Sequence, residues 1–299
     1  MSVIQGVYAA AVTPRRLGCQ DINLGAMWDL VDYLISQGAQ GLVFLGSTGE
    51  FVHFSNSERM RLMGVAVKRS RVPVIFNCSH STSDGAVELA QSADASGAAA
   101  ILLSPPYFFS YTQAQVIDFY RYVVREAELE TPVVLYNIPQ FTTGLSLDTV
   151  RVLVHEGVAQ CVKDSSGDLN YFNSLLDLRR ESPFSLMLGN DSLTTSVRSD
   201  GIISGVACAV PELTLALDRA VGNHVTEVVT RLEARLRQFI EWSDRLPVPV
   251  AIKEATAIRG LKVGPHALPN DGAFAHSLEA FREWFRGWLP GVQSECKHV

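Results

Sequence analysis

The chain has 299 residues, of which 47% are hydrophobic and 19% are charged, the composition of a globular protein with a substantial apolar core. Acidic residues outnumber basic ones, and the net charge of -6 argues against nucleic acid or an anionic membrane as the principal partner. No uncharged apolar run is long enough to span a bilayer, and the first residues lack the basic flank and apolar core of a signal peptide.

The cysteines are few, widely spaced and odd in number, and none lies in a Cys-x-x-Cys pair. This pattern predicts reduced, buried thiols in a cytoplasmic protein. The five are Cys19, Cys78, Cys161, Cys208 and Cys296.

Short apolar runs rich in Val, Ile and Leu alternate with amphipathic stretches along most of the chain. Continuous apolarity of this kind is typical of parallel strands that are buried on both faces. Eight strand-helix units suggest a closed barrel or a doubly wound sheet, and the number favours the α/β fold of the (β/α)8, or TIM, barrel. The expected strands are 7–12, 41–45, 72–76, 98–103, 132–136, 158–163, 184–188 and 201–206.

Local signals predict where several helices begin or end. Gly38 follows an amphipathic stretch as a C-terminal stop, Thr112 with Gln115 forms a capping box, and Asp168 is a helix N-cap. Pro211 suits a first helical position.

The strand signal stops near Thr226, and three helical segments follow at about 225–244, 248–259 and 274–289. We predict a barrel of residues 1–224 that carries the site, followed by a helical C-terminal extension of residues 225–299.

Barrel enzymes place their chemistry at the carboxyl ends of the strands, where Lys163 and Tyr136 end two consecutive runs. A partly desolvated lysine favours its neutral amine, which attacks ketones to form a Schiff base, and a phenol one strand away can relay protons. The alternatives are an ion pair of Lys163 with Asp164 or Asp168, and a tyrosine that merely closes the rim.

The segment Gly46–Glu50 has the composition of an anion-binding turn. Its glycines expose backbone N–H groups, its two hydroxyls add donors, and a carboxylate is a suitable guest. The alternative is an ordinary turn that caps a helix. We expect Glu50 to hold the loop rather than to react. His53 and His80 could face the same rim, but no His-x-His or His-x-x-x-His pair occurs, so we expect neither a metal nor another cofactor.

Taken together, these segments resemble the dihydrodipicolinate synthase and N-acetylneuraminate lyase family, with one motif at each expected strand end. The matching segments are 6–14, 41–51, 135–139, 162–168, 189–191 and 201–213.

This resemblance implies a pyruvate-dependent class I aldolase on a (β/α)8 barrel, active as a homotetramer or dimer and free of metal. It implies that Lys163 forms the Schiff base and that Tyr136 shuttles protons. The implied substrate contacts are Ser47 and Thr48 at the carboxylate and Gly189 and Ile203 along the pyruvyl pocket, with Tyr107 as a contribution to a neighbouring subunit.

Two positions depart from the synthase pattern. Phe141 stands where the synthases have an arginine that binds the second substrate, and a phenyl ring cannot replace a bidentate cation. Tyr107 is followed by Phe108, where the synthases have a second tyrosine.

We therefore predict a Schiff-base-forming lyase, aldolase or dehydratase, acting on pyruvate or a 2-oxo acid such as a 2-keto-3-deoxy sugar acid. The alternatives are a 4-hydroxy-tetrahydrodipicolinate synthase and, in another class, a non-catalytic barrel that binds 2-oxo acids.

Overall fold

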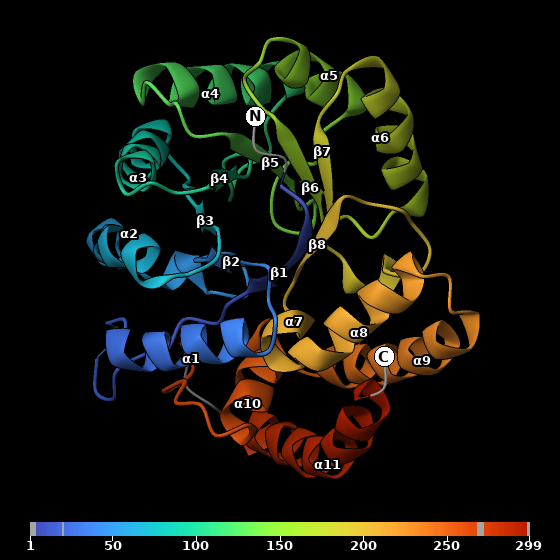
Figure 1. The fold of residues 1–299 in the computed structure, drawn as a ribbon. Coiled ribbons are helices and arrows are strands. Elements are labelled where there is room, and N and C mark those ends of the chain that lie inside the picture. The colour runs from blue at the N-terminus through green and yellow to red at the C-terminus, as the bar shows by residue number, and fades with distance from the viewer. Residues whose placement is uncertain (1–3, 20, 268–271, 298–299) are drawn as a thin grey trace. The chain divides into compact units, whose positions relative to one another are not determined.

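A computed structural model describes residues 4–19, 21–267 and 272–297. Its strands form one closed parallel sheet in the order β1 to β8, each followed in the chain by helical structure (Figure 1). The (β/α)8 barrel predicted from the alternating pattern is confirmed. The strands are β1 Gly6–Ala10, β2 Gly41–Phe44, β3 Val74–Asn77, β4 Ala100–Leu103, β5 Val133–Asn137, β6 Cys161–Asp164, β7 Ser185–Leu188 and β8 Gly201–Ser204.

The helices of the barrel follow the predicted signals. Thr112 and Gln115 form a capping box, the Asp168 carboxylate accepts from two backbone N–H groups, and Pro211 occupies the first turn of its helix. Gly38 follows its helix with a φ of +97°. These helices are α1 Leu24–Ser36, α2 Asn56–Arg69, α3 Ser83–Ala95, α4 Gln113–Glu126, α5 Leu147–His155, α6 Leu169–Glu181 and α8 Pro211–Gly222, with short 3-10 helices at η1 Phe51–His53 and η2 Asp191–Leu193.

The end of the last strand was predicted wrongly. The apolar run continues to Val206, but β8 ends at Ser204 and the short helix α7 occupies Val206–Ala209. The Ser204 hydroxyl accepts from the Ala207 backbone N–H at 2.9 Å, and Gly205 is already helical. The helix thus begins within the predicted strand, at the point where Ser204 interrupts its apolar residues and bonds to the first turn of the helix.

The chain forms two compact units. The first comprises Met1–Gly6 with Asn56–Ile203, and the second Val7–Ser55 with Ser204–Val299. In the first unit, β5 pairs with β6 and β6 with β7, and α3 and α4 pack side by side. The expected boundary between 224 and 225 falls inside the second unit, between α8 and the next helix α9, Thr226–Ser243, and stays a prediction.

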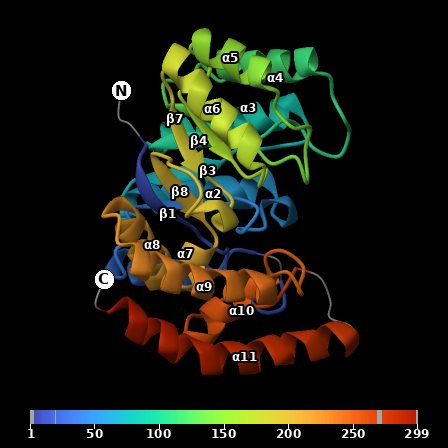
Figure 2. The same cartoon turned by 90° about the vertical axis from the view of Figure 1, so that its right-hand side faces the viewer.

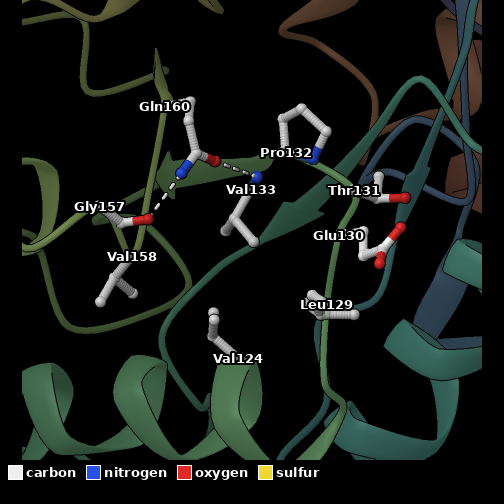
Figure 3. Close-up of a pocket in the computed structure, with 9 residues that line it drawn as sticks. All are labelled: Val124, Leu129, Glu130, Thr131, Pro132, Val133, Gly157, Val158 and Gln160. Atoms are coloured by element: carbon white, nitrogen blue, oxygen red, sulfur yellow. Dashed lines mark hydrogen bonds between the residues drawn. The ribbon is translucent and has the colours of Figure 1, made fainter. Parts of the chain in front are cut away.

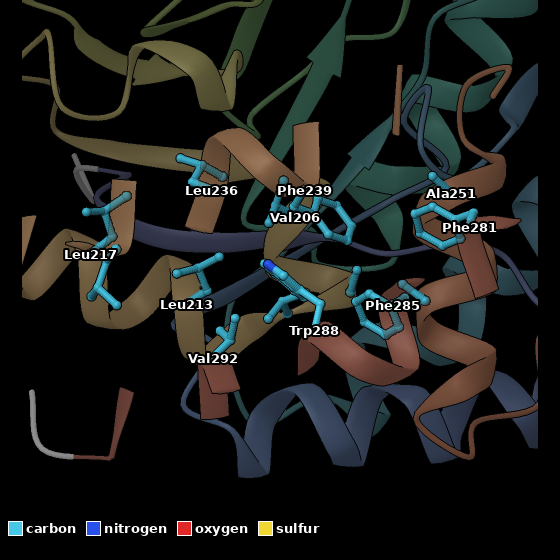
Figure 4. Close-up of a cluster of buried hydrophobic side chains, with 14 of the residues drawn as sticks. Val206, Leu213, Leu217, Leu236, Phe239, Ala251, Phe281, Phe285, Trp288 and Val292 are labelled. Carbon is cyan, nitrogen blue, oxygen red and sulfur yellow. The ribbon is translucent and has the colours of Figure 1, made fainter. Parts of the chain in front are cut away.

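The second unit has its own aromatic core (Figure 4). Phe239 of α9 contacts the rings of Phe281, Phe285 and Trp288 at centroid distances of 5.8 to 6.3 Å. Leu213 of α8 belongs to the same cluster. The C-terminal helices are α9 Thr226–Ser243, α10 Val250–Ile258 and α11 Gly272–Cys296, and Figure 2 shows α11 alongside α9.

Two predictions, about membrane-spanning segments and about thiols, can be compared with this fold. Across the described ranges, no helix has both the length and the apolarity needed to cross a membrane. Four of the five cysteines are buried, but Cys19 is exposed. The expectation that every thiol is buried was therefore wrong for Cys19, which lies in a turn after β1 and outside the apolar runs.

Candidate active site

Lys163 and Tyr136 lie at the same level on neighbouring strands. Tyr136 of β5 is paired with Lys163 of β6 in the parallel register. Tyr136 is 3% exposed and Lys163 is 4% exposed. The Lys163 Nζ lies over the Tyr136 ring, 4.1 Å from its centroid. The structure therefore brings together the two residues in which the sequence placed the chemistry.

The carboxylates that offered an alternative partner for Lys163 are engaged elsewhere. Asp164 accepts from the Asn137 amide at 2.7 Å and from the Ser166 hydroxyl at 2.8 Å. Asp168 caps α6 through the Asn170 and Tyr171 backbone N–H groups. Both carboxylates are thus used to build the loop after β6.

The Asn137–Asp164 bond ties β5 to β6 one residue beyond the Tyr136–Lys163 level. Both residues are almost fully buried, at 2% and 0% exposure. The Asn137 amide oxygen also accepts from the Leu145 backbone N–H at 3.0 Å, so the amide is used on both sides. Burial raises the pKa of Asp164, while its hydrogen bonds to Asn137 and Ser166 oppose the shift. The sequence analysis did not single out Asn137 and considered Asp164 only as an ion-pair partner.

Gly189 lies against the side chain of Lys163. A Cβ at Gly189 would be 2.7 Å from the Lys163 Cε, 2.1 Å from the Ser165 Oγ and 3.0 Å from the Asp164 carbonyl oxygen. The Gly189 backbone N–H donates to that same carbonyl at 2.7 Å. Only glycine fits this approach of two strand ends, so Gly189 borders the candidate nucleophile.

Ile203 occupies a buried position near the end of β8, with 1% exposure. The strand register aligns Lys163 with Met187 and Met187 with Gly201, which places Ile203 two residues beyond the Lys163 level.

Ser47 and Thr48 belong to the second unit and lie in the loop directly after β2. Both are half-buried. The loop is a tight turn, because the Glu50 N–H donates to the Ser47 carbonyl at 3.1 Å. The Thr13 hydroxyl donates to the Gly49 carbonyl at 2.7 Å. A Cβ at Gly49 would lie 2.9 Å from the Leu45 backbone, so this end of the loop also requires glycine.

Glu50 closes the same loop with a buried carboxylate. Its Oε2 accepts from the Lys253 Nζ at 2.9 Å, and its Oε1 lies 3.6 Å from an Arg15 nitrogen. Glu50 therefore holds the loop, as expected from the sequence, and does so through these two cations. Neither cation was expected from the sequence, because no spacing rule connects Glu50 with Arg15 or with Lys253, which is 203 positions away.

A family model described as the dihydrodipicolinate synthetase family matches residues 3–273. The chain belongs to this family. The probable 2-dehydro-3-deoxy-D-pentonate aldolase YjhH of Escherichia coli K12 is 30% identical over 82% of this chain and 84% of that protein. The 4-hydroxy-tetrahydrodipicolinate synthase of Methanospirillum hungatei is 26% identical over 94% of this chain and 98% of that protein.

Solved structures agree with this assignment. A putative dihydrodipicolinate synthetase from Pseudomonas aeruginosa superposes with a TM-score of 0.86 at 26% identity, covering 98% of this chain and 100% of that one. YagE of E. coli K12, solved in complex with pyruvate, has a TM-score of 0.87 at 24% identity over 96% and 99% of the two chains and supports the fold. As a member of the dihydrodipicolinate synthetase family, this protein is a pyruvate-dependent, Schiff-base-forming lyase.

The two departures from the synthase pattern of this family lie in loops of the first unit. Tyr107 forms an isolated antiparallel bridge with Thr142, which brings the loops after β4 and β5 together. Phe141, beside this bridge, is 58% exposed, and Phe108 is 87% exposed with a φ of +86°. The loop that carries an arginine in the synthases thus presents a phenyl ring to the surface.

A hollow of about 120 Å³ lies at the opposite end of β5 and β6 (Figure 3). Pro132 and Val133 line it where β5 begins, and the Gln160 side chain spans it to the Val133 N–H and the Gly157 carbonyl. Family chemistry takes place at the carboxyl ends of the strands, so this hollow is not the active site. Within the described part of the chain, no three His, Cys, Asp or Glu side chains group as metal ligands would.

Proposed function

We propose that Lys163 is the residue through which this lyase binds the C2 carbonyl of its 2-oxo acid. The observation that carries the proposal is the buried Lys163 amine at a strand end, held 4.1 Å from the centre of the Tyr136 ring. A neutral lysine amine is the nucleophile that adds to a carbonyl to form an imine.

The chemistry proceeds through an imine. The Lys163 amine adds to C2 and the adduct loses water. The protonated imine accepts the electron pair of the C3–C4 bond as it breaks, the C4 hydroxyl gives up its proton, and an aldehyde leaves. Protonation of the remaining enamine at C3 and hydrolysis of the imine release pyruvate and free Lys163. Tyr136 is the group placed to carry protons between these positions.

The substrate class that fits best is a 2-keto-3-deoxy sugar acid. Phe141 offers no cation for a second carboxylate, whereas the hydroxylated aldehyde half of a sugar acid needs none. The relative at 30% identity is named as a probable pentonate aldolase, which supports the same substrate class.

A second candidate is 4-hydroxy-tetrahydrodipicolinate synthase, supported by the names of relatives at 26% and 28% identity. The two candidates separate in a kinetic assay of pyruvate with aspartate semialdehyde beside an assay of 2-keto-3-deoxy sugar acid cleavage. Efficient turnover of the semialdehyde despite Phe141 would reverse our preference.

The remaining roles are part of the same proposal. Ser47 and Thr48 offer hydroxyls and backbone N–H groups to the substrate carboxylate, and Gly189 and Ile203 line the pyruvyl end. Tyr107 contributes to a neighbouring subunit of a homotetramer or dimer in the cytoplasm.

The decisive experiment is borohydride trapping with pyruvate, followed by peptide mass spectrometry. We expect a reduced pyruvyl adduct on Lys163. An adduct on another residue would move the nucleophile, and no adduct in folded protein at high pyruvate would favour the non-catalytic 2-oxo-acid-binding barrel.

A further inference from the structure

We propose that Lys253 of α10 is a positioning residue for the loop Gly46–Glu50, acting through Glu50 to set the affinity for the substrate carboxylate. The inference rests on the proposed role of Ser47 and Thr48 in binding that carboxylate. It assigns to the helical segment after the barrel strands a part in substrate binding.

Lys253 is a second buried lysine, with 0% exposure. Its Nζ donates to the Glu50 Oε2 at 2.9 Å and to the Pro265 carbonyl at 2.7 Å, so two of its three protons have partners at short range. Burial lowers the pKa of Lys253, and the neighbouring Glu50 opposes this shift. A charge-assisted bond in such a desolvated place is among the stronger contacts available to a loop.

Glu50 needs this contact because its backbone is unfavourable. Its φ of +56° and ψ of +37° lie in the left-handed region, which residues with a side chain rarely adopt. Arg15 supports the carboxylate from a second side, with its guanidinium 4.1 Å from the centre of the Phe54 ring. The side chain therefore holds Glu50 in a conformation that the backbone alone does not favour.

Two hydrogen bonds hold the loop next to Ser47 and Thr48, the two predicted donors to the substrate carboxylate. Thr13 holds the Gly49 carbonyl, and Lys253 holds the Glu50 carboxylate. Ser47 precedes these points and receives the Glu50 N–H on its carbonyl. A shift of Glu50 is therefore transmitted directly to the backbone of Ser47 and Thr48.

The experiment measures the pyruvate concentration that gives half-maximal borohydride trapping on Lys163. In Lys253→Met we expect this concentration to rise about tenfold or more, with the amount trapped at saturation nearly unchanged, as loss of one charge-assisted contact predicts. Glu50→Gln, which keeps the shape and one acceptor, should shift it in the same direction by less. Methyl pyruvate, which lacks the charge, should show the same midpoint in every variant.

Arg259→Met is the matched control. Arg259, which directly follows α10, is also a little-exposed cation, its side chain 6% exposed, and it is paired at 2.9 Å with Glu212, a residue outside the loop. We expect wild-type midpoints from this variant even if its unfolding free energy falls. An equal midpoint shift in Arg259→Met and Lys253→Met would overturn the proposal, as would an unshifted Lys253→Met, because Lys253 would then be a structural residue.

Wild-type protein gives a second readout that does not depend on a variant folding. After borohydride trapping of pyruvate, amide hydrogen exchange should slow together in residues 46–50 and in the turn of α10 around Lys253. Slowing confined to residues 46–50 would contradict the coupling. Failure of the underlying proposal looks different: wild type would then form no Lys163 adduct, or Thr48→Val would leave the pyruvate midpoint unchanged.

Discussion

The two units each bury a carboxylate beside a residue with a predicted functional role, and the carboxylates have partners of different kinds. Asp164, next to Lys163, accepts from the neutral Asn137 amide and Ser166 hydroxyl. Glu50, in the loop with Ser47 and Thr48, faces the cations Arg15 and Lys253. Around the proposed nucleophile the protein uses dipoles, and at the proposed anion-binding loop it uses full charges.

The choice between neutral and charged partners follows from the role that we propose for each neighbouring residue. A cation beside Asp164 would occupy space near the Lys163 amine and repel its protonated form. Neutral donors hold β5 against β6 without adding a positive charge there. A loop that receives a carboxylate benefits from nearby positive charge, and two cations against one Glu50 carboxylate supply it. The following predictions, from largest to smallest, test this contrast.

Lys163→Ala should abolish the borohydride-trapped pyruvyl adduct, because it removes the amine that we assign as the nucleophile. Lys253→Ala should still form the adduct at saturating pyruvate. Mass spectrometry of both variants makes the comparison. Trapping on Lys253 in either protein would mean that the two lysines had been assigned the wrong roles.

Glu50→Ala should lower the free energy of unfolding by about 3–5 kcal/mol, the usual loss when one partner of a buried ion pair is removed. It leaves Arg15 and Lys253 facing each other without an anion. Denaturant titration measures the change. A loss below about 1 kcal/mol, the size of an exposed ion pair, would show that the cations find water or other acceptors, and the contrast with Asp164 would disappear.

Tyr136→Phe should lower turnover by roughly two orders of magnitude or more, as expected for the loss of a positioned proton-transfer group. The ring that faces the Lys163 amine is retained, so adduct formation should survive better than turnover. Steady-state kinetics beside borohydride trapping separates the two effects. Wild-type turnover would remove the Tyr136 hydroxyl from the mechanism.

Gly189→Ala should reduce turnover by about tenfold to a hundredfold, because the new Cβ would lie 2.1 Å from the Ser165 Oγ and 2.7 Å from the Lys163 Cε and must displace both. Gly205→Ala is the corresponding variant in the second unit, where the atom nearest to the new Cβ would be the Thr48 hydroxyl oxygen at 3.1 Å. It should weaken pyruvate binding without changing the maximal rate of trapping.

Asp164→Asn should have the smallest effect, visible in the pH dependence of stability. The folded pKa of Asp164 is raised by burial, so the folded protein holds this proton more tightly than the unfolded chain does. Its contribution to stability is therefore present at low pH and is lost as pH rises through the interval above the ordinary value of 3.8. The variant should lack this decline in denaturant titrations across that interval. An identical pH profile would place the titration elsewhere.

Periodicity and strand order account for most of what the sequence predicted. Parallel strands in chain order bring neighbouring strand ends together, so Lys163 and Tyr136 could be paired from their positions in the sequence alone. Thr112 and Asp168 were identified as caps because capping is local and depends on a few adjacent residues.

What the sequence did not predict depends on distant contacts or on competing local bonds. The pairing of Glu50 with Lys253 joins a strand end to a late helix, and no spacing rule reaches across that distance. β8 ends early at Ser204, whose hydroxyl accepts from the Ala207 N–H in the first turn of α7, although apolar residues follow. Asn137 was overlooked because a polar residue after a strand usually indicates a turn.

All four tryptophans lie in the second unit, at positions 28, 242, 284 and 288, whereas Tyr107, Tyr111, Tyr120, Tyr122, Tyr136 and Tyr171 lie in the first. Trp242 and Trp284 stack at 4.9 Å, and the Trp288 indole donates to Gln238. Emission excited at the red edge of the tryptophan band consequently reports on the second unit, chiefly its C-terminal helices, and not on the Lys163 strand ends. Tryptophan fluorescence thus follows the second unit, and borohydride trapping on Lys163 follows the first, so the two units can be monitored separately in one chain.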